Sequence, residues 1–121
     1  MTDIRIKRIY EPASGDDGAR VLVDRIWPRG IRKDEAQLTL WLKDVAPSTA
    51  LRKWFGHDPA RWTEFRERYR RELAGDAPAV AELRDLAGEG RVTLLYGARD
   101  ETHNQAVVLA EYLKDRSGRT R

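Results

Sequence analysis

The sequence predicts a single compact α/β domain over residues 1–121, with helices packed on both faces of a small, mostly parallel sheet. Three observations lead to this class. The run VTLLY at 92–96 is typical of a strand buried on both faces at the centre of a parallel sheet. Amphipathic helix patterns precede and follow this strand, as expected in layered α/β folds. A chain of 121 residues buries roughly 65 to 70% of its unfolded surface, so a core forms without cross-links.

Two strands are expected near the N-terminus. Apolar residues alternating from Ile4 predict a first strand over 4–10. A loop over 11–18, which contains Gly-Asp-Asp-Gly, leads to a second strand over 20–26. The sequence leaves open whether these two strands run parallel.

Four helices are expected, and two of them lie in the middle of the chain. Ser48 is the expected N-cap of a helix over 49–55, which ends at Gly56. Asp58 and Pro59 open the clearest helix, whose arginines alternate with glutamates. This mixture favours a solvated helix with ion pairs over a nucleic-acid face. Its apolar stripe consists of Trp62, Phe65, Tyr69 and Leu73.

The last two helices flank the strand at 92–96. Asp76 is the expected cap of the first, which ends near Gly88. The motif Thr-His-Asn-Gln at 102–105 matches a capping box, which predicts a final helix behind it. Residues 115–121 are expected to form a flexible basic tail.

The composition excludes several classes of function. The chain has no cysteine, so it has no disulfide, thiolate metal site or cysteine nucleophile. Its two histidines are far apart, and we expect no metal and no cofactor. The N-terminus does not resemble a secretory signal and no segment is apolar enough to cross a membrane, so we expect a cytoplasmic protein without a membrane partner.

The basic residues are mainly arginines, 18 of the 23. The planar guanidinium group suits carboxylates and phosphates, although a GC-rich genome produces the same bias through codon usage. The net charge of +3 is too small to indicate a nucleic-acid partner by itself. The oligomeric state is left open.

Two expected strands end in unusual polar sequences. VDRIWPRG covers 23–30, and Gly-Ala-Arg-Asp follows the strand at 92–96. Ligands of open α/β sheets bind at the carboxyl ends of strands, where helix N-termini favour anions. The alternative is structural: Asp24 and Arg25 form an internal ion pair, and the turn after Pro28 needs Gly30 only for its conformation.

Other polar and aromatic residues also have structural alternatives. The four tryptophans are more typical of core anchors than of ligand platforms. His57 is a candidate general acid or base, or an exposed residue beside the Asp58 cap. His103 lies at the expected start of a helix, which disfavours its protonated form.

Three stretches of the chain carry a family resemblance: VLVDRIWPRGIRK, WLKDVAPSTALRKWFGHDPARWTEFRERYRREL and VTLLYGARDETHNQAVVLAEYL. They closely resemble the YeaO-like bacterial family, a family of unknown function, over residues 4–115. The resemblance implies no established activity. More distant relatives place a cysteine beside the histidine after the last strand, whereas Thr102 and Asn104 flank His103 here. The characteristic family positions correspond to Asp24, Arg25, Trp27, Pro28, Arg29, Gly30, Trp41, Lys43, Pro47, Ser48, Arg52, Trp54, Phe55, His57, Tyr96 and Asn104.

The leading hypothesis is a pocket for a small phosphorylated, carboxylated or nucleotide-like molecule. Arginines from several segments converge with the start of the last helix, and Trp27 or Trp54 supplies an apolar wall. Asp24, His57 and Asp100 are the acid and base candidates if the pocket is catalytic, and the sequence leaves open whether it is. The ligand-binding candidates are Arg25, Trp27, Arg29, Lys43, Ser48, Arg52, Trp54, Tyr96, Arg99, His103 and Asn104.

Two hypotheses of other classes remain. One is nucleic-acid binding through the arginine-rich helix and the tail residues Arg116, Arg119 and Arg121, which predicts steep weakening with salt. The other is a module without enzyme activity whose WPRG loop binds another protein.

Overall fold

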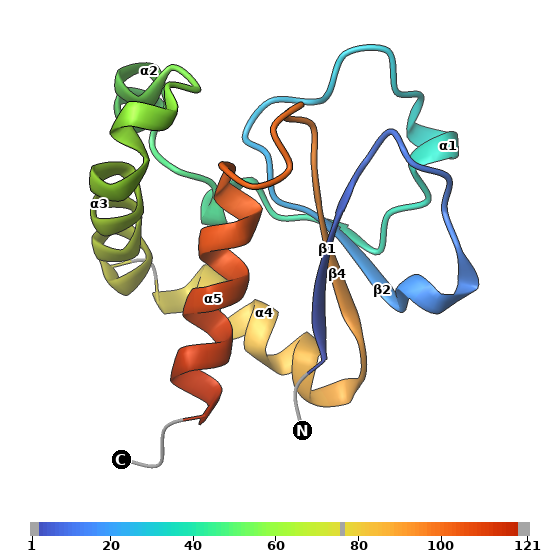
Figure 1. Cartoon of the computed structure of the whole chain (residues 1–121). Helices are drawn as coiled ribbons and strands as arrows, with labels where there is room; N and C mark the ends of the chain where they lie inside the picture. Colours follow the sequence, from blue (N-terminus) through green and yellow to red (C-terminus); the bar gives the residue numbers. More distant parts are fainter. Residues whose placement is uncertain (1–2, 76, 119–121) are drawn as a thin grey trace.

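The computed structural model describes residues 3–75 and 77–118, and its centre is a parallel sheet of four strands (Figure 1). The order across the sheet is β1-β4-β2-β3. The strands are β1 (Ile4–Arg8), β2 (Ala19–Leu22), β3 (Leu40–Trp41) and β4 (Val92–Tyr96). The VTLLY strand therefore lies inside the sheet, which explains why all five of its residues are buried.

The two N-terminal strands run parallel but do not pair with each other, because β4 lies between them. Ile4 of β1 lies opposite Val92, and Val21 of β2 lies opposite Leu94. Both strands are shorter than the sequence predicts, and β2 ends at Leu22. Asp24 and the residues after it therefore belong to a loop at the carboxyl end of the sheet.

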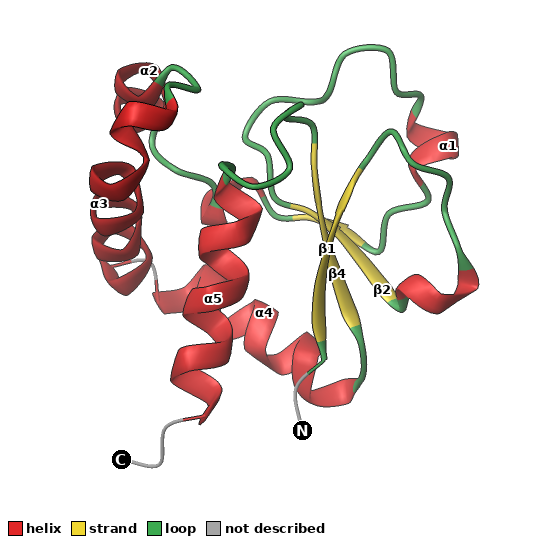
Figure 2. Ribbon diagram, viewed as in Figure 1, coloured by secondary structure: helices red, strands yellow, loops and turns green. Residues whose placement is uncertain are grey.

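The helices include the four that the sequence predicts and one short addition (Figure 2). They are α1 (Lys33–Ala36), α2 (Thr49–Phe55), α3 (Trp62–Gly75), α4 (Ala77–Glu89) and α5 (Gln105–Gly118). Short 3-10 turns lie at η1 (Gly15–Asp17), η2 (Lys43–Val45) and η3 (Pro59–Arg61). Helix α5 includes the first residues of the predicted tail, and 119–121 lie outside the described residues.

The helices cover the two faces of the sheet unequally, as Figures 1 and 2 show. Helices α2 to α5 pack on one face, where Val21 and Leu94 join them in the larger apolar cluster. The other face is covered by α1 and the loops around it, with Leu22 and Leu95 in a smaller cluster. The predicted α/β class with a parallel sheet is confirmed. The four tryptophans pack against these clusters, as expected of core anchors.

The helix caps show which local signals were sufficient. Ser48 Oγ accepts a hydrogen bond from the Leu51 N–H, and Asp58 accepts one from Ala60, so both predicted caps are confirmed. The predicted capping box at 102–105 is wrong, because Asn104 caps α5 by accepting a hydrogen bond from the Val107 N–H. The predicted cap Asp76 lies outside the described residues.

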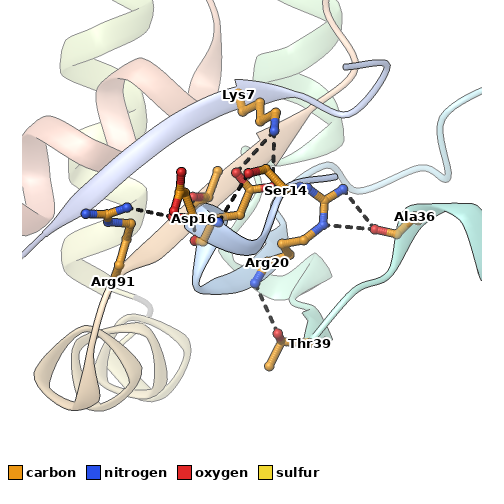
Figure 3. Close-up of polar contacts among 9 residues, drawn as sticks. Lys7, Ser14, Asp16, Arg20, Ala36, Thr39 and Arg91 are labelled. Carbon is orange, nitrogen blue, oxygen red and sulfur yellow. Dashed lines mark hydrogen bonds and ion pairs between the residues drawn. The ribbon is translucent and has the colours of Figure 1, made fainter. Parts of the chain in front are cut away.

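A buried charged group lies on the sheet face opposite the long helices (Figure 3). We call Lys7, Asp17 and Arg20 the Asp17 cluster. Lys7 Nζ lies 3.1 Å from both carboxylate oxygens of Asp17, and Arg20 Nη1 donates to the same carboxylate. The remaining Arg20 donors Nε and Nη2 bond the Ala36 carbonyl at 3.1 and 2.9 Å. These bonds satisfy the charges where no long helix covers the sheet.

None of the helices described in residues 3–75 and 77–118 combines the length and apolar character needed to cross a lipid bilayer.

Candidate functional site

A cavity of about 250 Å³ lies at the carboxyl ends of β2 and β4. We call it the strand-end cavity. It lies where the loops after two parallel strands meet the start of α5, the position at which open α/β sheets bind ligands. Its acidic, basic and histidine lining residues are Asp24, Arg25, Arg29, Arg52 and His57. The remaining lining residues are Tyr10, Ile26, Pro28, Ala46, Pro47, Gly97, Ala98 and Gln105.

Asp24 connects the end of β2 to the segments that follow β4. Its Oδ2 accepts a hydrogen bond of 2.9 Å from the Gly97 N–H, and its Oδ1 accepts one from Gln105 Nε2. Burial raises the pKa of the Asp24 carboxyl to about 6, although these two hydrogen bonds and the charge of Arg52 oppose the rise. A carboxyl group of this kind changes its charge near neutral pH.

Arg25 is bonded to carbonyl oxygens rather than to Asp24, so the ion pair that was the structural alternative does not form. Its Nε donates to the Pro47 carbonyl at 3.2 Å, and its Nη2 donates to the Ala46 carbonyl at 3.1 Å. These bonds fix the segment before α2 against the end of β2. Arg25 therefore contributes positive charge to the cavity while it also positions α2.

Arg52 also lines this cavity, and one of its donors is buried without a partner in the described part of the chain. It lies on α2, and its Nε is buried with no hydrogen-bond partner among the described residues. Arg29 reaches the cavity from the loop after β2 and is exposed. The loop after β2 thus contributes two guanidinium groups to the cavity and α2 contributes a third. These positive charges outnumber the carboxylate of Asp24, so the cavity is electropositive while Asp24 is either charged or neutral.

His57 lies between the strand-end cavity and an adjoining hollow. Its backbone φ of 57° is left-handed, and its exposed side chain follows the Gly56 that ends α2. The adjoining hollow is also lined by Arg99 and Asp100, and shares Gly97 and Ala98 with the cavity. Arg99 therefore lies next to the three arginines rather than among them.

Asp100 holds the turn before α5 together. Its Oδ1 accepts hydrogen bonds from the Thr102 and His103 N–H groups at 2.9 and 3.0 Å, and its Oδ2 lies 3.0 Å from His103 Nδ1. The Thr102 N–H and the other donors hold the pKa of this carboxyl well below its usual range, even though desolvation opposes them. Asp100 is thus poorly suited to take up a proton in catalysis. The ring of His103 packs edge-on against Trp62.

Several predicted site residues do not line the strand-end cavity, and the contacts of two of them, Trp27 and Trp54, are with other parts of the protein. Trp27 donates its indole N–H to the Ile31 carbonyl and packs at 5.2 Å against Trp41. Trp54 lies beneath the guanidinium of Arg68. The other predicted residues outside the cavity are Lys43, Ser48, Tyr96, Arg99, Asp100, His103 and Asn104.

Three of these have clear structural contacts. Lys43 lies over the ring of Trp41 at 4.4 Å, and Ser48 donates its hydroxyl to Glu72 in addition to capping α2. Asn104 Nδ2 donates to the Asp100 carbonyl at 2.8 Å. Tyr96 is only 2% exposed, and burial raises the pKa of its hydroxyl.

Eight of the residues that line the cavity are not predicted as site residues, and four of them have contacts or positions that shape it. Gly97 and Gln105 hold the carboxylate of Asp24, and a Cβ at Gly97 would approach Asp24 Oδ2 to 3.0 Å. Tyr10 and Ile26 form part of the lining. The available signal was the position of Gly97 directly after β4, because parallel strand ends meet at one edge of the sheet. Among the described residues, no group of histidines and carboxylates is arranged to hold a metal ion.

The family of the chain follows from comparison with known proteins. Residues 3–121 match the family model described as the inactive DUF488-N3 subclade, so the chain belongs to this family. The uncharacterized protein Rv3073c of Mycobacterium tuberculosis is 50% identical over 115 residues, which cover 95% of this chain and 97% of that protein. The uncharacterized protein YeaO of Escherichia coli is 46% identical over 112 residues, which cover 93% and 97%. The resemblance to the YeaO-like family is confirmed, and no solved structure matches the chain.

Proposed function

We propose that the strand-end cavity binds a small molecule through a phosphate or carboxylate group. The observation that carries this proposal is that three guanidinium groups, those of Arg25, Arg29 and Arg52, line one cavity at the strand ends. An anionic ligand would compensate the positive charges that these groups bring to the cavity, and the Nε of Arg52 is not bonded to any other group among the described residues. Charge-assisted hydrogen bonds to an anion are among the strongest that such a site can form.

The size of the cavity supports a small ligand. Its volume of about 250 Å³ lies below the roughly 300–1,000 Å³ typical of drug-sized ligand sites. A phosphate ester or a short carboxylic acid fits this volume better than a complete nucleotide does.

Binding without chemistry is better supported than catalysis. Asp100 is held in its charged form, Arg25 is bonded to two carbonyls, and the chain has no cysteine. The description of the family as inactive points the same way. Each oxygen of Asp24 accepts one hydrogen bond, from Gly97 or from Gln105, and keeps a second lone pair that can accept a bond from a ligand hydroxyl.

The test is isothermal titration of the purified protein with inorganic phosphate and with acetate. We expect saturable binding of at least one of them, weakened about tenfold or more by Arg52→Met, the scale expected when a charge-assisted hydrogen bond is lost. Lys53→Met is the matched control, because it removes the same charge from the adjacent, exposed position. Absence of binding by both anions, or equal losses in the two variants, would refute the proposal.

The nucleic-acid hypothesis gains little support from α3. Arg66 bonds Glu111 at 2.7 Å, and Arg68 pairs with Glu64. These contacts match the ion-paired helix that the sequence favours. The side chains of Arg116, Arg119 and Arg121 lie outside the described residues, so this hypothesis and that of a protein-binding WPRG loop stay predictions.

A further inference from the structure

The rim of the strand-end cavity carries an unusual pair of side chains. Tyr10 is 43% exposed and Ile26 is 60% exposed, and they are the two large hydrophobic residues that stand out as exposed in the described part of the chain. Both line the same cavity. Single exposed apolar residues are common on protein surfaces, but two that meet at one polar cavity point to a shared role.

Ile26 is exposed although its neighbours are fixed. Arg25 is bonded to the carbonyls of Ala46 and Pro47, and Trp27 packs against Trp41 on the other side. The backbone on both sides of Ile26 is thus anchored, and the side chain is held toward solvent at the cavity.

Tyr10 is held in place in a similar way. Its hydroxyl donates to the Arg29 carbonyl at 2.8 Å, and the guanidinium carbon of Arg8 lies 4.8 Å from its ring centroid. Arg8 is itself fixed by a 2.8 Å bond from its Nε to the Ala98 carbonyl. The ring is therefore a preformed part of the cavity wall.

We infer that the ligand carries an apolar group next to its anionic group, and that Ile26 and Tyr10 contact this apolar group. This inference rests on the proposed function, because the arginines must hold the anionic end. The guanidinium groups of Arg29 and Arg52 bind the head group, while Ile26 and the ring of Tyr10 remove the attached hydrocarbon from water. The ligand class is then an alkyl or aryl phosphate or carboxylate rather than a free inorganic anion or a sugar phosphate.

The experiment compares ligands that differ only in their apolar part. We would titrate the full chain with methyl phosphate and hexyl phosphate, and with acetate and hexanoate. Each fully buried methylene strengthens binding up to about fourfold, so partial burial predicts at least about a tenfold preference for the longer member of a pair. We expect Ile26→Ser to remove most of this preference, because the affinity for hexyl phosphate or hexanoate should fall more than the affinity for methyl phosphate or acetate.

Two control variants separate hydrophobic contact from loop structure. Ile26→Leu keeps an apolar side chain and should keep the preference, and Tyr10→Phe keeps the ring while it loses the bond to the Arg29 carbonyl. Equal affinity for short and long ligands, or an unchanged preference in Ile26→Ser, would overturn the inference and leave anion binding intact. If none of the four compounds binds, the proposed function fails and this inference fails with it.

Discussion

Two aspartates flank the same strand, Asp17 before β2 and Asp24 after it, and their surroundings differ in kind. Asp17 accepts hydrogen bonds from Lys7, from Arg20 and from the Ser14 N–H. Asp24 accepts bonds from two neutral donors, the Gly97 N–H and the amide of Gln105. One carboxylate is thus matched by cations in direct contact, and the other is not.

The two pKa values shift in opposite directions for this reason. Desolvation raises the pKa of both carboxyl groups. For Asp17 the bonds from Ser14, Lys7 and Arg20 outweigh desolvation, and the pKa falls below its usual value. For Asp24 desolvation wins, and the pKa rises to about 6.

The comparison separates a structural polar cluster from a candidate binding site. In the Asp17 cluster, Lys7 and Arg20 both pair with Asp17, so no charge of the cluster is left without a partner (Figure 3). At the strand-end cavity the Nε of Arg52 has no partner among the described residues. Burial favours the neutral form of the Asp24 carboxyl group. An unpaired donor and a raised carboxyl pKa at one cavity favour a binding site, although in the described part of the chain Arg84 also has unpaired buried donors, Nε and Nη2, outside this cavity.

The largest effect on the free energy of unfolding is expected from a substitution in the Asp17 cluster. Asp17→Asn leaves Lys7 and Arg20 without their anion, and the Arg20 side chain is only 6% exposed. Loss of one partner of a buried ion pair costs about 3–5 kcal/mol, so the free energy of unfolding should fall by about that much. Urea denaturation at pH 7 measures this change.

The same aspartate-to-asparagine substitution at the strand-end cavity is the control. Asp24→Asn removes a carboxylate whose charged form burial disfavours, so the free energy of unfolding at pH 7 should not fall by the amount expected for Asp17→Asn. Equal losses in the two variants would show that the distinction between the two regions is wrong.

A smaller effect is expected from pH. The pKa of Asp24 is about 6 in the folded protein and 3.8 is its ordinary value, so between these pH values the folded state holds a proton that the unfolded state has lost. Stability from this group is complete below pH 3.8 and decreases as the pH rises through 6, by up to about 3 kcal/mol at 1.36 kcal/mol per unit.

Asp17 acts in the opposite direction, because its lowered pKa gives stability that is lost as the pH falls below 3.8. The measurement therefore compares the native protein with Asp24→Asn at pH 4 and pH 7, so that other groups cancel. The native protein should lose stability relative to the variant as the pH rises. A constant difference between the two proteins would contradict a raised pKa at Asp24.

The parts of the fold that the sequence predicts are those with local causes. The caps Ser48 and Asp58 and the buried run at 92–96 depend on a few neighbouring residues. The sheet order does not, because β4 enters between β1 and β2 from the far end of the chain. The two-residue strand β3 and the single turn α1 are too short to give a periodic signal.

The candidate site shows the same division. The sequence names the strand end at Asp24 and the arginines, and the structure brings Arg25, Arg29, Arg52 and His57 to one cavity with it. The sequence does not reveal that Arg25 bonds backbone carbonyls 21 and 22 residues away, or that Gln105 bonds Asp24, which is 81 residues away. Residue type predicts that a guanidinium needs a partner, but only the fold decides which one.

The smallest change in the free energy of unfolding is expected when an arginine is replaced by methionine at the strand-end cavity. The same substitution in the Asp17 cluster completes the comparison. Arg52→Met removes a guanidinium whose Nε is unbonded, so it should change the free energy of unfolding by less than about 1 kcal/mol. Arg20→Met removes bonds to Asp17 and to the Ala36 carbonyl from a buried position, and should cost several times more. Urea denaturation without added anion measures both. Because Arg52 helps to keep Asp24 charged, its loss should also move the pH dependence of stability upward. A large loss of stability in Arg52→Met would mean that this guanidinium stabilises the fold. That result would count against a role for Arg52 in binding an anion.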